Sequence, residues 1–139
     1  KVLMEGGRGL QLVAGRVNAT IERAIQVPAL AVHANALGAA LAQVGAATKA
    51  AWATGEPGDA LANAVPYMQA FGHTVLAWVW LDVALVTLRS DATLSVASSA
   101  GRMGAARYFY HYELPKIGAW LNVVTSRDAT CASLPEDAF

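Results

Sequence analysis

Hydrophobic side chains recur at steps of three and four residues over most of the chain, and this spacing is typical of α-helices. The first such run spans Leu10–Ile25, with its charged side chains on the opposite side. Pro28 interrupts the pattern, which resumes over Ala29–Ala53 with many alanines. The two runs predict an antiparallel pair of helices that approach each other closely, the first keeping one face in water.

The most apolar stretch runs from Tyr67 to Leu88 and holds only two side chains that can carry charge near neutral pH, His73 and Asp82. Hydrophobic residues cover every side of the predicted helix, so we expect it to be buried all round, in a helical assembly or in a bilayer. A bilayer span needs about 20 apolar residues. The two polar residues and the lack of flanking basic clusters argue against a span and favour the helical core. One bundle of this size need not cover every face of the helix, and a partner would pack on the uncovered side.

Turn residues separate this stretch from its neighbours. The sequence GEPGD at 55–59 ends the second helix, and Asp59 is placed to cap the next one. Pro66 lies near the start of the third helix and removes a backbone hydrogen bond there. Pro66 must therefore kink this helix or split off a short first segment, and we expect a kink.

Small polar residues over 89–101 predict a loop, and a fourth helix follows from Arg102 to Val124 with an interruption at Pro115. No segment alternates with a period of two, which argues against strands. The predicted fold class is all-α, an antiparallel bundle of four main helices with proline kinks. We predict a linker over 1–9, the bundle over 10–126, and a tail over 127–139 whose terminal Phe139 docks back.

Composition narrows the class of protein. The 139 residues are 55% hydrophobic and 14% charged, with a mean hydropathy of +0.37, so the chain is expected to bury surface against a partner. Ten basic and ten acidic residues give a net charge of zero, which argues against nucleic-acid binding. The single cysteine, Cys131, has no partner for an intramolecular disulfide, and this fits a cytoplasmic protein.

Few residues suggest chemistry. The histidines His33, His73 and His111 lie on three different predicted helices without a ligand at one-turn spacing, so no metal site is predicted. Glu113 is surrounded by aromatic residues, which could raise its pKa toward that of a general base. With no second acid or ligand motif nearby, a structural ion pair is the favoured interpretation.

Two further features concern packing. Asp82 and Arg107 are each isolated in an apolar helix, and buried charges are usually paired, so we hypothesise that these two side chains meet. The aromatic residues of 108–112 point in all directions around a helix, which favours a role in the core and at an interface over base stacking.

Two segments resemble a known family. PYMQAFGHTVLAWVWL at 66–81 and RMGAARYFYHYELP at 102–115 are similar to the C-terminal extension domain of large acyl-CoA dehydrogenases, and residues 2–7 look like the linker after the dehydrogenase core. Two features depart from the family pattern: Ser98–Gly101 stand where aromatics are common, and Asp82 stands where a basic or amide residue is expected. The structural motif residues in and beside these segments are Pro66, Tyr67, Phe71, Gly72, His73, Trp78, Asp82, Arg107, Tyr108, Glu113 and Pro115.

The resemblance implies an appended helical domain of an FAD-dependent enzyme that oxidises acyl-CoA to 2-enoyl-CoA. The flavin site and the catalytic carboxylate would lie upstream of Lys1, so no catalytic, cofactor-binding or metal-binding residue is expected in this chain. The implied partners are the upstream core, further copies of the enzyme and, for the parent, the acyl-CoA substrate. The alternative is a stand-alone helical module that binds a partner or a membrane surface.

Overall fold

The computed structural model describes residues 7–89 and 95–138, and every regular element in this part of the chain is helical. A π-type turn at Phe109–Glu113 and a 3₁₀ turn at Leu114–Lys116 join the last two long helices into one rod. A further 3₁₀ turn, Glu136–Ala138, lies in the tail. The helices are α1 (Arg8–Ile25), α2 (Ala31–Ala51), α3 (Pro57–Leu61), α4 (Ala64–Arg89), α5 (Val96–Tyr108) and α6 (Ile117–Thr125).

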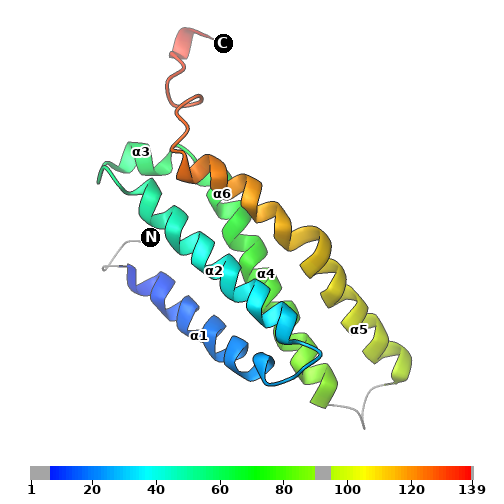
Figure 1. Cartoon of the computed structure of the whole chain (residues 1–139). Helices are drawn as coiled ribbons and strands as arrows, with labels where there is room; N and C mark the ends of the chain where they lie inside the picture. Colours follow the sequence, from blue (N-terminus) through cyan, green and yellow to red (C-terminus); the bar gives the residue numbers. More distant parts are fainter. Residues whose placement is uncertain (1–6, 90–94, 139) are drawn as a thin grey trace.

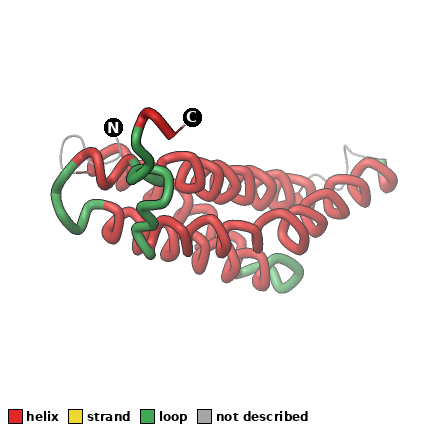
Figure 2. The backbone as a smooth tube through the Cα atoms, turned by 90° about the horizontal axis from the view of Figure 1, so that it is seen from above, coloured by secondary structure: helices red, strands yellow, loops and turns green. Residues whose placement is uncertain are grey.

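Four rods lie side by side along the length of the molecule: α1, α2, α4 and the continuous α5–α6 rod (Figures 1 and 2). Their directions alternate along the chain, and α4 contacts α1, α2, α5 and α6. The all-α antiparallel bundle predicted from the sequence is therefore confirmed. The tail after α6 extends away from the end of the bundle where α3 lies (Figure 1), and Phe139, which we expected to dock back, lies outside the described residues.

Small side chains are numerous in the core on α2 and α4. The alanines Ala34, Ala40, Ala70, Ala77 and Ala84 are all between 0% and 2% exposed. Because alanine carries little bulk, such faces let neighbouring helices approach closely. Larger side chains fill the rest of the core and include Val17, Leu30, Leu37, Val44, Leu81, Leu85, Leu121 and Val124.

The connection before α4 differs from the prediction. Asp59 lies in the first turn of α3 instead of capping a helix, and its carboxylate accepts a hydrogen bond of 3.0 Å from the Thr54 hydroxyl. Pro66 is the third residue of α4, where a backbone N–H has no acceptor within the helix. The expected kink at Pro66 is therefore wrong, since α4 continues unbroken to Arg89. The structure shows the alternative, a short separate first segment, because α3 is followed by a turn at Ala62 and Asn63.

The last rod begins earlier than predicted. Helix α5 starts at Val96, six residues before Arg102, because the Ser95 side chain caps it by accepting a hydrogen bond of 3.1 Å from the Ser98 backbone N–H. The prediction of a loop over the whole of 89–101 is thus wrong for 96–101, and residues 90–94 lie outside the described residues.

Pro115 interrupts this rod, as predicted. The ring of Pro115 has no N–H to donate and would clash with a carbonyl of the preceding α-helical turn. Immediately before Pro115 the helix widens into a π turn, in which the Leu114 N–H donates to the Phe109 carbonyl five residues earlier. The helix then tightens through Leu114–Lys116 and resumes as α6.

Candidate interaction surface

The motif residues of α4 contact three neighbouring elements: α2, α1 and the π turn. Near its start, the hydroxyls of Tyr67 and Thr48 on α2 lie 2.8 Å apart in a hydrogen bond. Burial raises the pKa of Tyr67, and the hydrogen bond to Thr48 opposes that rise. The Tyr67 ring also stacks on Phe71 with ring centroids 6.3 Å apart. Tyr67 therefore links α4 to α2, and Phe71 stacks against its ring.

A second set of contacts joins α4 to α1. The Trp78 indole N–H donates to the Thr20 hydroxyl at 2.9 Å, and Arg23 donates to the same oxygen at 3.0 Å. Arg23 also pairs with Asp82 at 2.8 Å. The predicted meeting of Asp82 with Arg107 is wrong, because Asp82 lies beside α1, whereas Arg107 is exposed and forms no ion pair among the described residues.

The third set joins α4 to the π turn. His73 Nε2 lies 3.6 Å from the Glu113 carboxylate, and Lys116 donates to the same carboxylate oxygen at 2.7 Å. His73 Nδ1 lies 3.0 Å from the backbone carbonyl oxygen of Gln69. The His73 and Trp120 rings pack edge to face, with their centroids 4.7 Å apart. The hydrogen bond from Lys116 and then the neighbouring His73 lower the pKa of Glu113. A general base near neutral pH needs a raised pKa, so these contacts support the structural ion pair.

A buried ring pair holds α2 against the π turn. His33 is 7% exposed and stacks on Tyr110 with ring centroids 4.5 Å apart and an interplanar angle of 7°. The Tyr110 hydroxyl donates to the Ala77 carbonyl at 2.9 Å, and burial raises its pKa. Burial also lowers the pKa of His33, and the nearby charges of His111 and Arg107 lower it further. Both buried groups are thus held in their neutral forms.

The aromatic residues of 108–112 divide between core and surface. Phe109 and Tyr110 are buried, which confirms the core part of the prediction. Tyr108 and Tyr112 are 57% and 65% exposed and stack on each other with ring centroids 4.9 Å apart. Their predicted role at an interface stays a prediction.

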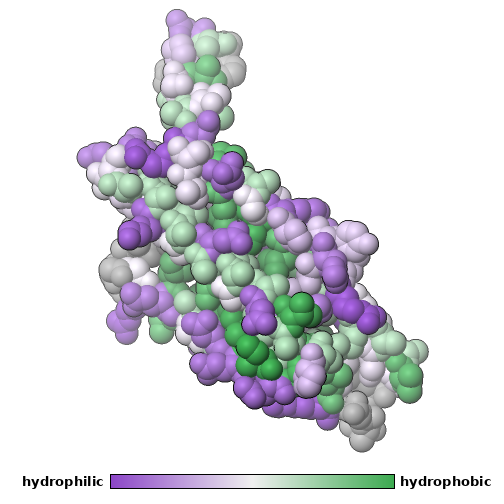
Figure 3. All heavy atoms as spheres, viewed as in Figure 1, coloured by the Kyte–Doolittle hydropathy of each residue, from purple (hydrophilic) through white to green (hydrophobic). Residues whose placement is uncertain are grey.

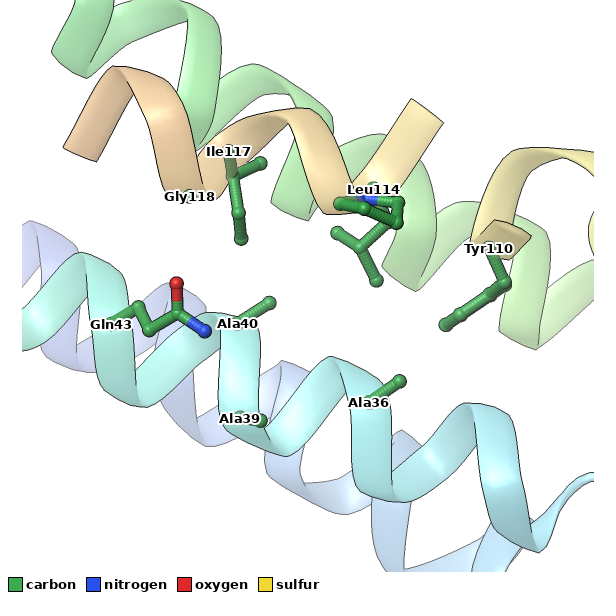
Figure 4. Close-up of a pocket in the computed structure, with 9 residues that line it drawn as sticks. Ala36, Ala39, Ala40, Gln43, Tyr110, Leu114, Ile117 and Gly118 are labelled. Atoms are coloured by element: carbon green, nitrogen blue, oxygen red, sulfur yellow. The ribbon is translucent and has the colours of Figure 1, made fainter. Parts of the chain in front are cut away.

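A groove of about 270 Å³ lies between α2 and the rod that contains Pro115 (Figure 4). Alanines 36, 39 and 40 form its α2 side, and Leu114 and Ile117 face them from the rod. The lining carries no charged side chain, and its polar groups are Gln43 and Tyr110. A flavin dinucleotide does not fit, because it needs a larger site with donors for its two phosphates. Among residues 7–89 and 95–138, no three His, Cys, Asp or Glu side chains are grouped so that they could hold a metal ion.

The side of α4 that no helix covers is apolar. Its exposed fractions are 71% for Val65, 57% for Met68, 47% for Leu76, 47% for Val79 and 50% for Val86. Within this chain α4 is therefore not buried all round, in line with the expectation that one bundle of this size leaves a face of the helix uncovered. We call this surface the α4 seam, and its positions are Val65, Met68, Gly72, Leu76, Val79, Val83 and Val86.

By length and composition alone α4 could cross a membrane, and 33% of its most apolar window is buried in the bundle. The opposite expectation, that no span is present, rests on His73 and Asp82. Asp82 forms an ion pair with Arg23 of α1, and His73 Nε2 lies 3.6 Å from the Glu113 carboxylate. Hydrophilic side chains are also distributed among hydrophobic ones over the face of the molecule seen in Figure 3.

The fold and contacts define an all-helical domain built around one apolar helix. The family described as acetyl-CoA dehydrogenase C-terminal like matches residues 13–135, which is most of the chain. The chain belongs to this family, and the resemblance inferred from 66–81 and 102–115 is confirmed. Comparison with curated proteins and with solved structures gave no match.

Proposed function

We propose that this chain is the C-terminal domain of an FAD-dependent acyl-CoA dehydrogenase and that its role is structural. The parent enzyme would oxidise acyl-CoA to 2-enoyl-CoA, with the flavin and the catalytic base supplied by a core upstream of Lys1. The observation that carries this proposal is the family match over residues 13–135. The helical domain would pack within the assembled enzyme, against its own core or against a second subunit.

The polar groups of the bundle support a structural role. Glu113, the carboxylate with the most suggestive sequence setting, is held by Lys116 at 2.7 Å and has a lowered pKa. The groove between α2 and α6 has neither the size nor the phosphate donors for flavin. Catalysis would therefore depend on groups outside this chain.

The α4 seam supports a role in packing. Monomeric proteins rarely expose a continuous apolar strip of this kind without a function for it. The same seam is the basis of the alternative, a stand-alone helical module that binds a protein or a membrane surface. A membrane-lying helix carries Lys and Arg on its polar face, but Arg89 is the sole basic residue of α4. The seam therefore favours a protein partner.

The test compares three purified proteins: the 139-residue chain, the parent protein, and the parent lacking residues 10–126. We expect flavin absorbance and acyl-CoA oxidation in the parent, and neither in the 139-residue chain. Removing residues 10–126 should change the number of subunits per particle in solution or the thermal stability of the flavoprotein. Flavin binding or turnover by the 139-residue chain would contradict the proposal, and a parent reading frame that begins near Lys1 would favour the alternative.

A further inference from the structure

We propose that the groove between α2 and the α5–α6 rod is a binding site for an aliphatic carboxylate of medium chain length. The hydrocarbon chain would lie along the apolar lining of the groove, and the carboxylate would bind Arg107 and His111 at one end of it. This inference goes beyond the proposed function. It concerns a ligand of this chain itself and holds whatever the chain is attached to.

The lining of the groove suits a hydrocarbon chain. Small side chains on α2 face the larger aliphatic side chains of Leu114 and Ile117 on the rod, and no lining side chain is charged (Figure 4). Ala39 is exposed and Ala36 is half-buried, so part of the apolar lining is open to solvent. A hydrocarbon chain placed there removes apolar surface from water on both molecules, which favours binding.

The size of the groove limits what it can hold. Its volume is about 270 Å³. One turn of a helix about 10 Å wide occupies roughly 400 Å³, so the groove is too small to take up a helix of a partner protein. An apolar cavity of about 150 Å³ holds benzene, and in proportion the groove has room for roughly ten carbon atoms. The volume therefore fits a narrow, flexible chain of medium length.

Two basic side chains lie beside one end of the groove. Tyr110 lines that end, with Gln43 toward the other end (Figure 4), and the Tyr110 ring stacks on His33. Arg107 and His111 lie close enough to His33 for their charges to lower its pKa. The same two residues therefore flank the Tyr110 end of the groove and make it electropositive.

Arg107 is available to bind an anion. It is exposed and forms no ion pair within the part of the chain that the structure describes. Glu113, the acid of the π turn, is held by Lys116 at 2.7 Å and faces His73 on α4. A guanidinium presents a planar set of donors that matches a carboxylate, and His111 adds an N–H donor. The charge at this end therefore selects an anionic head group over a neutral one.

The first test is isothermal titration calorimetry of the 139-residue chain with octanoate, hexanoate and octanol, each below the concentration at which it forms micelles or separates. We expect saturable binding of one octanoate per chain. Each buried methylene group changes affinity by about fourfold, so hexanoate should bind roughly 15-fold more weakly. Octanol lacks the charge and should also bind more weakly. The absence of saturable octanoate binding, or equal affinities for the three compounds, would overturn the proposal.

The second test fills the groove. Ala39→Phe places a large side chain in the groove from an exposed lining position, and it should weaken octanoate binding by about tenfold or more. The matched control is Ala42→Phe, because Ala42 is also exposed on α2 but does not line the groove. Circular dichroism checks that both variants keep their helix content. Octanoate binding that survives Ala39→Phe unchanged would show that the ligand lies elsewhere.

The third test concerns the head group. Arg107→Gln should weaken octanoate binding by about tenfold and leave octanol binding unchanged, because only octanoate carries the charge. The matched control is Arg102→Gln, since Arg102 is exposed on the same helix, five residues away, and does not lower the pKa of His33. An Arg107→Gln chain that binds octanoate like the wild type, or that loses octanol binding to the same extent, would overturn the assignment of the carboxylate to Arg107.

Discussion

The indole N–H of Trp78 donates a hydrogen bond of 2.9 Å to the hydroxyl of Thr20, which is 2% exposed between α1 and α4. Arg23 binds the same hydroxyl and also Asp82, one turn beyond Trp78. Two motif residues of α4 are thus connected through one threonine and one arginine of α1. This polar contact fixes the lengthwise position of α1 against α4, which apolar packing alone defines poorly.

Replacing Trp78 with alanine should lower the free energy of unfolding by about 3–5 kcal/mol, because the change removes a large side chain packed against the core. Urea denaturation followed by circular dichroism measures this loss. Trp78→Phe keeps an aromatic ring and removes the N–H donor, so it should cost about 1 kcal/mol. A Trp78→Ala variant as stable as the wild type would contradict the packing described for this side chain.

The ion pair between Arg23 and Asp82 should contribute little by itself. Its side chains are 46% and 48% exposed, and pairs of this kind are typically worth about 0.2–1 kcal/mol. A double-mutant cycle with Arg23→Gln and Asp82→Asn measures the coupling energy. Arg23→Gln alone should cost more than Asp82→Asn alone, because it also removes the donor to Thr20. Equal costs for the two single variants would argue against that second bond.

His33 should make stability depend on pH. Its pKa in the folded state lies below the ordinary value of 6.5, so the unfolded chain binds the proton more readily. The stabilisation from neutral His33 is complete above pH 6.5 and is lost as the pH falls through the lower pKa of the folded state. His33→Phe keeps a ring against Tyr110 and cannot titrate. We therefore expect the wild type to lose more stability than His33→Phe between about pH 7.5 and pH 5. Identical pH profiles would show that His33 does not titrate differently on folding.

The cap of α5 gives a local prediction. Ser95→Ala removes the acceptor for the Ser98 N–H and should lower the free energy of unfolding by about 1 kcal/mol. Ser99→Ala, four residues along and inside the helix, is the matched control and should be neutral or slightly stabilising. Amide hydrogen exchange should show faster exchange at the start of α5 in Ser95→Ala alone. If both variants behave alike, the cap does not hold the helix end.

Helix periodicity in the sequence predicts the position of most of the long helices. The runs predicted at 10–25 and 29–53 lie within two residues of α1 and α2 at each end, because both combine regular apolar spacing with a clear break. The start of α5 was missed, since residues 96–101 are small and have no apolar period. Ser95 was the available signal, because serine is a preferred helix cap.

Side-chain partners were harder to predict than helices. The isolation of Asp82 and Arg107 in apolar runs predicts that they pair, but periodicity does not say which neighbouring helix a given face meets. The hydroxyls of Thr20 and Thr48, which bind Trp78 and Tyr67, were missed. Both threonines stand on otherwise apolar faces, where a polar group needs a partner. That pattern could have identified them.

The π turn before Pro115 has a consequence for how the last rod meets the bundle. An α-helix turns 100° per residue, so a turn with a wider pitch rotates everything after it relative to everything before it. Helix α5 packs mainly on α4, whereas α6 packs on both α4 and α2. Phe109–Glu113 thus rotates the helix surface between α5 and α6, so that each half of the rod presents the face that its own neighbours contact. Deleting one residue there would remove this extra rotation, so that the part of the rod after Pro115 would present the wrong stripe to α2.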